Sequence, residues 1–171
     1  MAIALWLARM DRALTEQEQL RMTELLPQQR RQRLERQQPK NQREVLCAYL
    51  ILRMALQEQL GWRDLPEIAL GEQGKPFFPE HPEVHFSLSH TTAAAAAALS
   101  DAPIGVDIEH IRPVSLRTME RLAGVQTTEA FFKSWVRREA RAKRTGAGVV
   151  TMVRGEAPLN RGEFYYEAQA F

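Results

Sequence analysis

The stretch Ile104-Gly105-Val106-Asp107-Ile108-Glu109 decides how this sequence folds. Its apolar and acidic side chains alternate, and a period of two residues predicts a β-strand over residues 104–108. Val106 and Ile108 then face one side of the strand. Asp107 and Glu109 face the other, roughly 6 to 7 Å apart. These two acids either hold one hard cation between them or lie on the solvent face of an edge strand.

The residues before this strand predict a half that mixes strands with helices. Caps, apolar periodicity and turn residues mark its elements. The expected elements are a strand over Ile3–Ala8, a helix capped by Thr15 and ending near Leu26, a solvated helix or loop over Gln28–Gln38, a long helix capped by Asn41 and ended by Gly61, and strands over Ile68–Gly71 and Val84–Leu88. Between the last two strands, Gly74-Lys75-Pro76 is a turn signal.

The six consecutive alanines Ala93–Ala98 have two interpretations. Alanine has the highest helix propensity, which favours a helix. However, two threonines precede the run and Ser100-Asp101-Ala102-Pro103 closely follows it, so a helix here would be too short to be stable without packing. A buried strand with small side chains is the competing prediction.

The residues after the central strand repeat the earlier order of elements. We expect a helix over Ser115–Leu122, a helix capped by Thr127 or Thr128 that reaches about Arg144, and strands over Val149–Val153 and Phe164–Ala168. The sequence therefore predicts an α+β protein of two pseudo-symmetric α/β halves, residues 1–103 and 104–171, with a truncated second half.

Composition limits the class of protein. The chain has 171 residues, of which 44% are hydrophobic and 26% charged, as in ordinary soluble globular proteins. No stretch approaches the roughly 20 apolar residues of a membrane helix, and the N-terminal residues lack the basic region of a signal peptide. The single cysteine, Cys47, fits a reducing compartment. We therefore expect a cytoplasmic protein that is not inserted in a membrane.

Trp135, Glu139 and Lys143 follow one another at intervals of four residues, which places them on one ridge of a helix. Glu139 could supply a third oxygen ligand beside the two strand acids, with Lys143 one turn further on. Alternatively, Glu139 and Lys143 form an ion pair on a solvated face while Trp135 packs into the core.

The segment Phe86-Ser87-Leu88-Ser89-His90-Thr91 ends a predicted strand in hydroxyls and an imidazole, which are groups suited to contacting an anion. The sequence has neither the G-x-S-x-G turn of a hydrolase nor a glycine-rich phosphate-binding loop. The predicted chemistry therefore rests on acids, cations and hydroxyls rather than on a nucleophile of this chain.

Four motifs in this order resemble the 4′-phosphopantetheinyl transferase superfamily, in its long, two-half type that activates peptide, polyketide and fatty-acid synthases. They are Gly74-Lys75-Pro76-Phe77, Phe86-x-Leu88-Ser89-His90, Gly105-Val106-Asp107-Ile108-Glu109 and Trp135-x-x-Arg138-Glu139-Ala140-x-x-Lys143-x-x-Gly146-x-Gly148. The resemblance covers roughly residues 3–148, and the last two motifs are specific only in combination.

The resemblance implies a Mg²⁺-dependent transfer of 4′-phosphopantetheine from coenzyme A to a serine of an apo acyl or peptidyl carrier protein, with release of 3′,5′-ADP. It implies that Asp107, Glu109 and Glu139 bind the metal, that Glu139 is also the general base, and that Lys143 faces the phosphates. Mg²⁺ prefers oxygen ligands and usually keeps several waters or phosphate oxygens, which suits three acids and a pyrophosphate.

The resemblance also implies where coenzyme A lies. Lys75 and Pro76 match the stretch along its adenosine, and Ser89 and His90 match contacts to its 3′-phosphate. Arg43 sits where the family often has a nucleotide-binding arginine. The basic run near Arg30 and Arg33 matches a region that also meets the phosphates.

The sequence departs from the family in several places. Arg138 replaces a lysine, Ser87 stands where asparagine is common, and Thr91 stands where serine is usual. The segment between Ile111 and Phe131, which in relatives tends to touch the carrier protein, is compressed. The chain after Gly148 is also shorter than in relatives.

Two other functions are compatible with parts of the sequence. An inactive relative would bind coenzyme A or a carrier protein without transfer, although all three candidate metal ligands are present. A nucleic-acid-binding protein would use the arginine runs, but no aromatic residue interleaves residues 30–40, and the net charge is only +2. We therefore expect coenzyme A and a carrier protein as partners, not nucleic acid, and a monomer, with a dimer left open.

Overall fold

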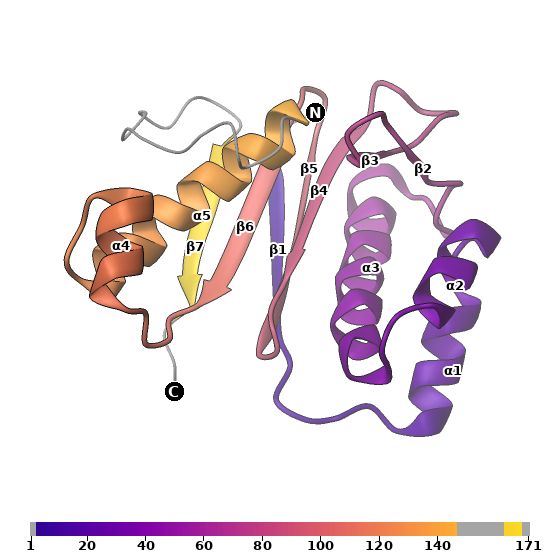
Figure 1. Cartoon of the computed structure of the whole chain (residues 1–171). Helices are drawn as coiled ribbons and strands as arrows, with labels where there is room; N and C mark the ends of the chain where they lie inside the picture. The colour runs from indigo at the N-terminus through magenta and orange to yellow at the C-terminus, as the bar shows by residue number, and fades with distance from the viewer. Residues whose placement is uncertain (1–2, 147–162, 169–171) are drawn as a thin grey trace.

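In the computed structural model of the chain, residues 3–146 and 163–168 are described. The elements are β1 Ala4–Arg9, α1 Glu16–Glu24, α2 Gln28–Glu35, α3 Pro39–Leu60, β2 Ala69–Leu70, β3 Pro76–Phe77, β4 His85–His90, β5 Ala94–Ser100, β6 Gly105–His110, α4 Leu116–Ala123, α5 Thr128–Thr145 and β7 Glu163–Ala168 (Figure 1). The predicted α+β class is confirmed.

The elements form successive layers. Strands β1, β5 and β4 make an antiparallel sheet in that order, and α1 to α3 lie on one side of it (Figure 1). Strands β6 and β7 lie on the other side and pair in parallel, with α4 and α5 outside them. The two sheets therefore meet in the middle of the molecule, between two helical layers.

The alanine run is a strand, as the second interpretation proposed. Ala95 and Ala97 belong to the core that contains α3, whereas Ala96 and Ala98 pack with β6. All four are fully buried. Because both faces of β5 are covered at close range, small side chains suit the position, and packing overrides the helical propensity of alanine.

The helix ends show which local signals are decisive. Thr15 caps α1 in a reciprocal arrangement with Glu18, as the sequence predicts. The prediction that Asn41 caps α3 is wrong: the helix begins at Pro39, after Gln38. Proline is favoured at the first helical position because its φ angle is already helical and no hydrogen-bond donor is lost there.

The remaining elements largely follow the sequence. The residues 28–38, left open between helix and loop, form α2. Ser115 and Thr127 cap α4 and α5 through their side chains, and the predicted final strand is present as β7. The predicted strand Val149–Val153 lies outside the described residues. No helix within the described ranges combines the length and hydropathy needed to cross a membrane.

Within the described residues, both predicted halves have the order strand, two or more helices, strand, but they differ in pairing. In the first half β1 and β4 are separated by β5, whereas in the second half β6 pairs directly with β7. The boundary near residue 103 and the pseudo-symmetry of the halves remain predictions.

Gly105 allows α5 to lie directly on β6. A Cβ atom at this position would be 1.9 Å from the carbonyl oxygen of Ala140 and 2.7 Å from the backbone nitrogen of Arg144. These are backbone atoms in the middle and last turns of a helix, so they cannot move aside as a flexible side chain would. Any larger residue at Gly105 must displace the helix.

We therefore expect Gly105→Ala to lower the free energy of unfolding by about 1 to 3 kcal/mol, the usual range for overpacking. The matched control is Gly71→Ala, whose added Cβ would lie 3.6 Å from the carbonyl oxygen of Lys75, an ordinary contact. Chemical denaturation of both variants tests this expectation. Equal stability of the two variants would contradict the close approach of α5 and β6.

Candidate active site

A cavity of about 440 Å³ opens between the two halves. The walls come from α2, α3, the β3 region and β4 on one side and from the last turns of α5 on the other. The arginine, lysine, histidine and glutamate side chains on the wall are Arg30, Arg33, Lys75, His90, Glu139 and Lys143. The volume lies within the range of small-molecule sites, and the excess of cations favours an anionic ligand.

Arg30 is the most constrained cation of the wall. Its guanidinium lies over the ring of Tyr49, 5.7 Å from the centroid, and its Nε and Nη2 atoms are buried with no hydrogen-bond partner. Burial and the neighbouring Arg33 lower the pKa of Arg30 below its ordinary value, against the opposing effect of Tyr49. Two cations held close together in a partly buried wall are suited to a multiply charged anion.

Lys75 joins the two halves at the edge of the cavity. The predicted turn forms with Gly74 at φ 80°, and it carries Lys75 toward α5. The Lys75 Nζ donates to the carbonyl oxygens of Arg144, at 2.6 Å, and of Ile104, at 3.4 Å. Burial, with a smaller contribution from the charge of Arg144, lowers the pKa of Lys75.

His90 lines the cavity, and Glu44 of α3 holds its ring. The His90 Nδ1 atom lies 3.1 Å from Glu44 Oε2. An ionised carboxylate only accepts hydrogen bonds, so this contact assigns the hydrogen to Nδ1 and leaves Nε2 for another partner. Arg43, the residue before Glu44 in α3, is not part of the cavity wall. It donates to the carbonyl oxygens of Arg12 and Thr92 and so fastens two loops.

Asp107 is the centre of a buried charge cluster. Only 4% of the residue is exposed, and its Oδ1 accepts from Lys143 Nζ at 2.6 Å and from the Ser89 hydroxyl at 2.8 Å. Burial raises the pKa of Asp107, and this effect outweighs the stabilisation of the carboxylate by Lys143 and Ser89. The Oδ2 atom is buried and has no hydrogen-bond partner.

Glu139 lies beside this cluster on the cavity wall. Its pKa is raised, first by burial, then by the charge of Asp107 and, less strongly, by that of Glu109, while Lys143 opposes the shift. The three acids are thus near enough for their charges to repel one another. The predicted ridge of α5 therefore carries Glu139 and Lys143 to the site, while Trp135 packs against Phe131 in a separate apolar cluster.

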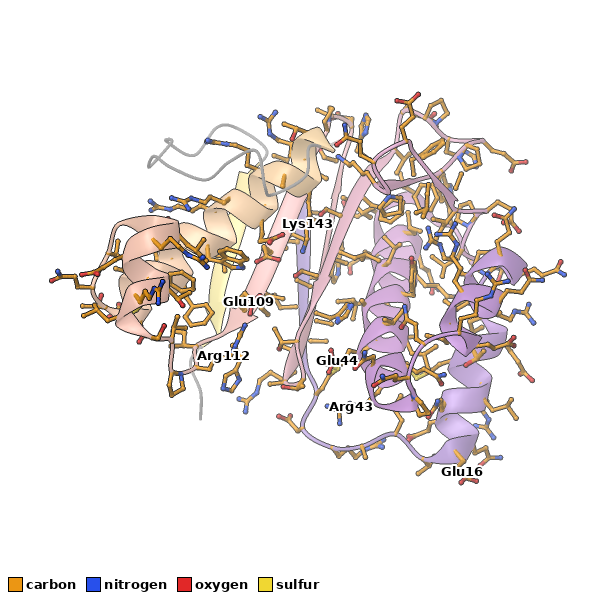
Figure 2. The ribbon with its side chains drawn as sticks, viewed as in Figure 1. Glu16, Arg43, Glu44, Glu109, Arg112 and Lys143 are labelled. Atoms are coloured by element: carbon orange, nitrogen blue, oxygen red, sulfur yellow. The ribbon has the colours of Figure 1, made fainter. Side chains whose placement is uncertain are left out.

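Glu109 has a cation of its own. Arg112 Nη1 lies 2.9 Å from Glu109 Oε2, and the Arg112 guanidinium also lies over the ring of Phe132. Figure 2 shows Glu109 and Arg112 together near the end of β6, whereas Lys143, which belongs to α5, lies toward the start of that strand. Each of the two strand acids therefore has a cationic neighbour.

The described residues contain no cluster of three or more His, Cys, Asp or Glu side chains already arranged around a metal position. The donor set nevertheless fits a hard cation. Asp107 has a buried oxygen without a partner. The charge of Glu109 adds to the cost of ionising Asp107, and the charges of Asp107 and Glu109 add to the cost of ionising Glu139. A divalent cation among carboxylate oxygens would remove both penalties.

No family model matches the chain, but individual relatives do. The 4′-phosphopantetheinyl transferase Sfp of Bacillus subtilis (strain 168) is 28% identical over 155 residues, which cover 82% of this chain and 69% of the relative. The transferase psf-1 of Bacillus pumilus is 38% identical over 88 residues, 44% of this chain and 38% of the relative. The transferase AcpT of Escherichia coli (strain K12) is 38% identical over 104 residues, 52% of this chain and 53% of the relative.

The chain is therefore similar to several curated 4′-phosphopantetheinyl transferases. Arg138, which stands where the resemblance leads us to expect a lysine, donates to the carbonyl oxygen of Leu122. It therefore ties α5 to the end of α4 instead of contacting the cavity. The substitution falls on a packing contact between helices.

The structure brings together most of the residues that the sequence singled out for this transferase fold. Lys75, Pro76 and His90 line the cavity with Glu139 and Lys143, and Asp107 and Glu109 lie behind them. Arg43 and Ser89 do not line it. Sequence reasoning missed Glu44 and Arg112. Arg112 follows Glu109 by three residues, a spacing that could have suggested the pair, whereas nothing local links Glu44 to His90, 46 residues away.

The ion pair between Lys143 and Asp107 can be tested without any assumption about ligands. We expect Lys143→Met to lower the free energy of unfolding by about 1 to 3 kcal/mol, because it leaves a buried carboxylate without its cation. Adding Asp107→Asn to this variant should recover most of the loss, since the amide carries no charge.

Denaturant titrations of the single and double variants measure this coupling. Lys133→Met, at an exposed position of the same helix, is the matched control and should change stability little. Additive effects of the changes at residues 107 and 143 would contradict the pairing.

Proposed function

We propose that the chain transfers the 4′-phosphopantetheine group of coenzyme A to a serine of an apo acyl or peptidyl carrier protein, in a Mg²⁺-dependent reaction that releases 3′,5′-ADP. The observation that carries this proposal is the cationic cavity, which borders directly on the buried cluster of Asp107, Lys143 and Glu139. The similarity to curated proteins named 4′-phosphopantetheinyl transferases supports it.

The cavity wall would hold the nucleotide part of coenzyme A. Arg30 and Arg33 on one side would offer cations to its phosphates, and His90 on the other side would offer a ring nitrogen. Lys75 and Pro76 lie at the edge where the adenosine would rest. The unpartnered N–H groups of Arg30 are suited to phosphate oxygens. Coenzyme A binding would therefore satisfy donors that are buried in the free protein.

Asp107, Glu109 and Glu139 would hold Mg²⁺, whose chemistry when bound is to neutralise the pyrophosphate and stabilise the departing 3′,5′-ADP. Lys143 already stands among these acids and would contribute a second positive charge toward the phosphates. Phosphoryl transfer depends mainly on positioning and on neutralisation of charge, which are the properties of this arrangement.

The reacting serine belongs to the carrier protein, so no nucleophile of this chain is needed. The serine hydroxyl attacks the β-phosphorus of coenzyme A, and a new phosphorus–oxygen bond to the serine forms. The bond from that phosphorus to the bridging oxygen breaks, and 3′,5′-ADP leaves with this oxygen. Glu139 takes the proton of the serine hydroxyl, directly or through a water molecule.

Incubation with Mg²⁺, coenzyme A and a panel of apo carrier proteins tests the proposal. We expect at least one carrier to gain the mass of one phosphopantetheine group at a serine, measured by intact-protein and peptide mass spectrometry. A carrier with this serine replaced by alanine is the control and should gain nothing. Binding of coenzyme A without any mass gain would favour an inert binding protein instead.

The site assignment predicts the effect of single changes. Glu139→Gln and Asp107→Asn should each slow transfer by about 10²- to 10⁴-fold, the range for loss of a general base or of a charged ligand. Glu129→Gln, an exposed glutamate in the first turn of the same helix, should transfer like the unchanged chain. Full transfer by either site variant in the mass-gain assay would overturn the assignment.

The pair between Arg112 and Glu109 predicts a change in metal requirement. Because Arg112 competes with a cation for Glu109, Arg112→Gln should lower the Mg²⁺ concentration for half-maximal transfer by about two- to fivefold, the scale of an exposed ion pair. Arg117→Gln on the exposed surface of α4 is the control. A higher requirement in the Arg112 variant would contradict the competition.

A further inference from the structure

Two serines connect the central strands of the two halves. Ser87 and Ser89 lie two residues apart on β4, so they share the face that meets β6, and both are almost fully buried. The Ser87 hydroxyl oxygen accepts from the Val106 backbone N–H at 3.0 Å. The Ser89 hydroxyl oxygen accepts from the Ile108 backbone N–H at 3.2 Å. These side chains take the place of strand carbonyls.

Ser89 makes two further contacts that Ser87 does not show. Its hydroxyl donates to Asp107 Oδ1 at 2.8 Å, and its oxygen also accepts from Lys143 Nζ at 2.9 Å. A hydroxyl has one hydrogen to donate and two lone pairs to accept with. All three are used by Asp107, Ile108 and Lys143, so the orientation of the hydroxyl is fully determined.

The fixed hydroxyl of Ser89 in turn orients the carboxylate of Asp107. Its Oδ1 is held by both Ser89 and Lys143, and this fixes the rotation of the carboxylate about its last bond. Its other oxygen, Oδ2, remains buried and unpartnered on the same rigid strand. Without the serine, the side chain of Lys143 alone would hold the Asp107 carboxylate. Lysine side chains are flexible, and in the proposed reaction the charge of Lys143 is also directed toward the phosphates.

We propose that Ser89 is a positioning residue that fixes the Asp107 carboxylate so that Oδ2 is presented to the divalent cation. This inference rests on the proposed function and deepens it, because it gives Ser89 a role in the metal site beyond the predicted contact to the 3′-phosphate of coenzyme A. Ser89 does not line the cavity, whereas the next residue, His90, does. Hydrogen-bond partners of metal ligands commonly set affinity by fixing the orientation of the ligand.

The test compares Ser89→Ala with Ser87→Ala. Each change removes one acceptor for a backbone N–H of β6, and Ser89→Ala also removes the contacts to Asp107 and Lys143. Both variants should remain folded in denaturant titrations, with Ser89→Ala the less stable of the two. Mn²⁺, used as a probe for the divalent cation, is then titrated by calorimetry in the absence of coenzyme A. Coenzyme A is left out because Ser87 lines the cavity in which it would bind, so a change at Ser87 could alter coenzyme A binding. We expect Ser89→Ala to weaken Mn²⁺ binding by about tenfold and Ser87→Ala to change it less than twofold.

A third variant guards against loss of folding. Ser89→Cys keeps a side chain of similar size but replaces the hydroxyl by a weak donor and acceptor, so it should show the same loss of Mn²⁺ affinity. Full Mn²⁺ affinity in the Cys variant, or equal losses in the two alanine variants, would overturn the role of Ser89.

The outcome separates this inference from the proposed function. If the unchanged chain binds no Mn²⁺ but still adds phosphopantetheine to a carrier, the transferase stands and the role of Ser89 falls. If it neither binds Mn²⁺ nor adds mass to any carrier, both fall. A tenfold difference between the serine variants supports the inference.

Discussion

The close approach of α5 to β6 at Gly105 is the constraint on which the site depends. With no side chain at this position, the backbone of the helix lies directly against the strand. The direction of the helix then decides what meets Asp107, two residues further along the strand. Lys143 reaches its carboxylate, and Glu139, one turn earlier, lies at the cavity. Because Gly105 has no side chain, the helix and the strand come close enough for Asp107 of β6 and Glu139 and Lys143 of α5 to lie near one another.

Much of this fold could be predicted because its signals are local. Alternation in residues 104–109 predicted both the strand and the separation of its faces, and Val106 and Ile108 do pack against the first sheet. The start of α3 was misplaced because Asn41 is a good cap in isolation, while Pro39 sets the actual first turn. The alanine run could not be decided from its sequence, since burial on both faces of β5 comes from α3 and β6, which are distant along the chain.

The candidate site likewise combines residues that local patterns predict with contacts that only the packed structure reveals. The order of the motifs located Asp107, Glu139 and Lys143, because a strand period and a helix period each constrain where these side chains point. The order of the motifs could not locate the residues that bind and orient the site side chains. Glu44 reaches His90 across 46 residues, and Arg43 turns to backbone carbonyls of two loops, an outcome that no residue pattern near it indicates. Ion pairs between distant residues depend on the packing of whole layers, which sequence spacing does not encode.

The charges of the site explain how the free protein tolerates it. A buried carboxylate without a counter-charge is strongly destabilising, and Asp107 is almost fully buried. Lys143 supplies that charge for Asp107, and Arg112 supplies one for Glu109. In the proposed reaction Asp107, Glu109 and Glu139 would hold a divalent cation. Lys143 would then pair with the negatively charged phosphates instead of with the Asp107 carboxylate. The same lysine would then serve stability in the free chain and phosphate binding in the complex. This exchange requires that Asp107 keep its place when Lys143 moves, and the hydroxyl of Ser89, fixed on β4, is the contact that can hold it there.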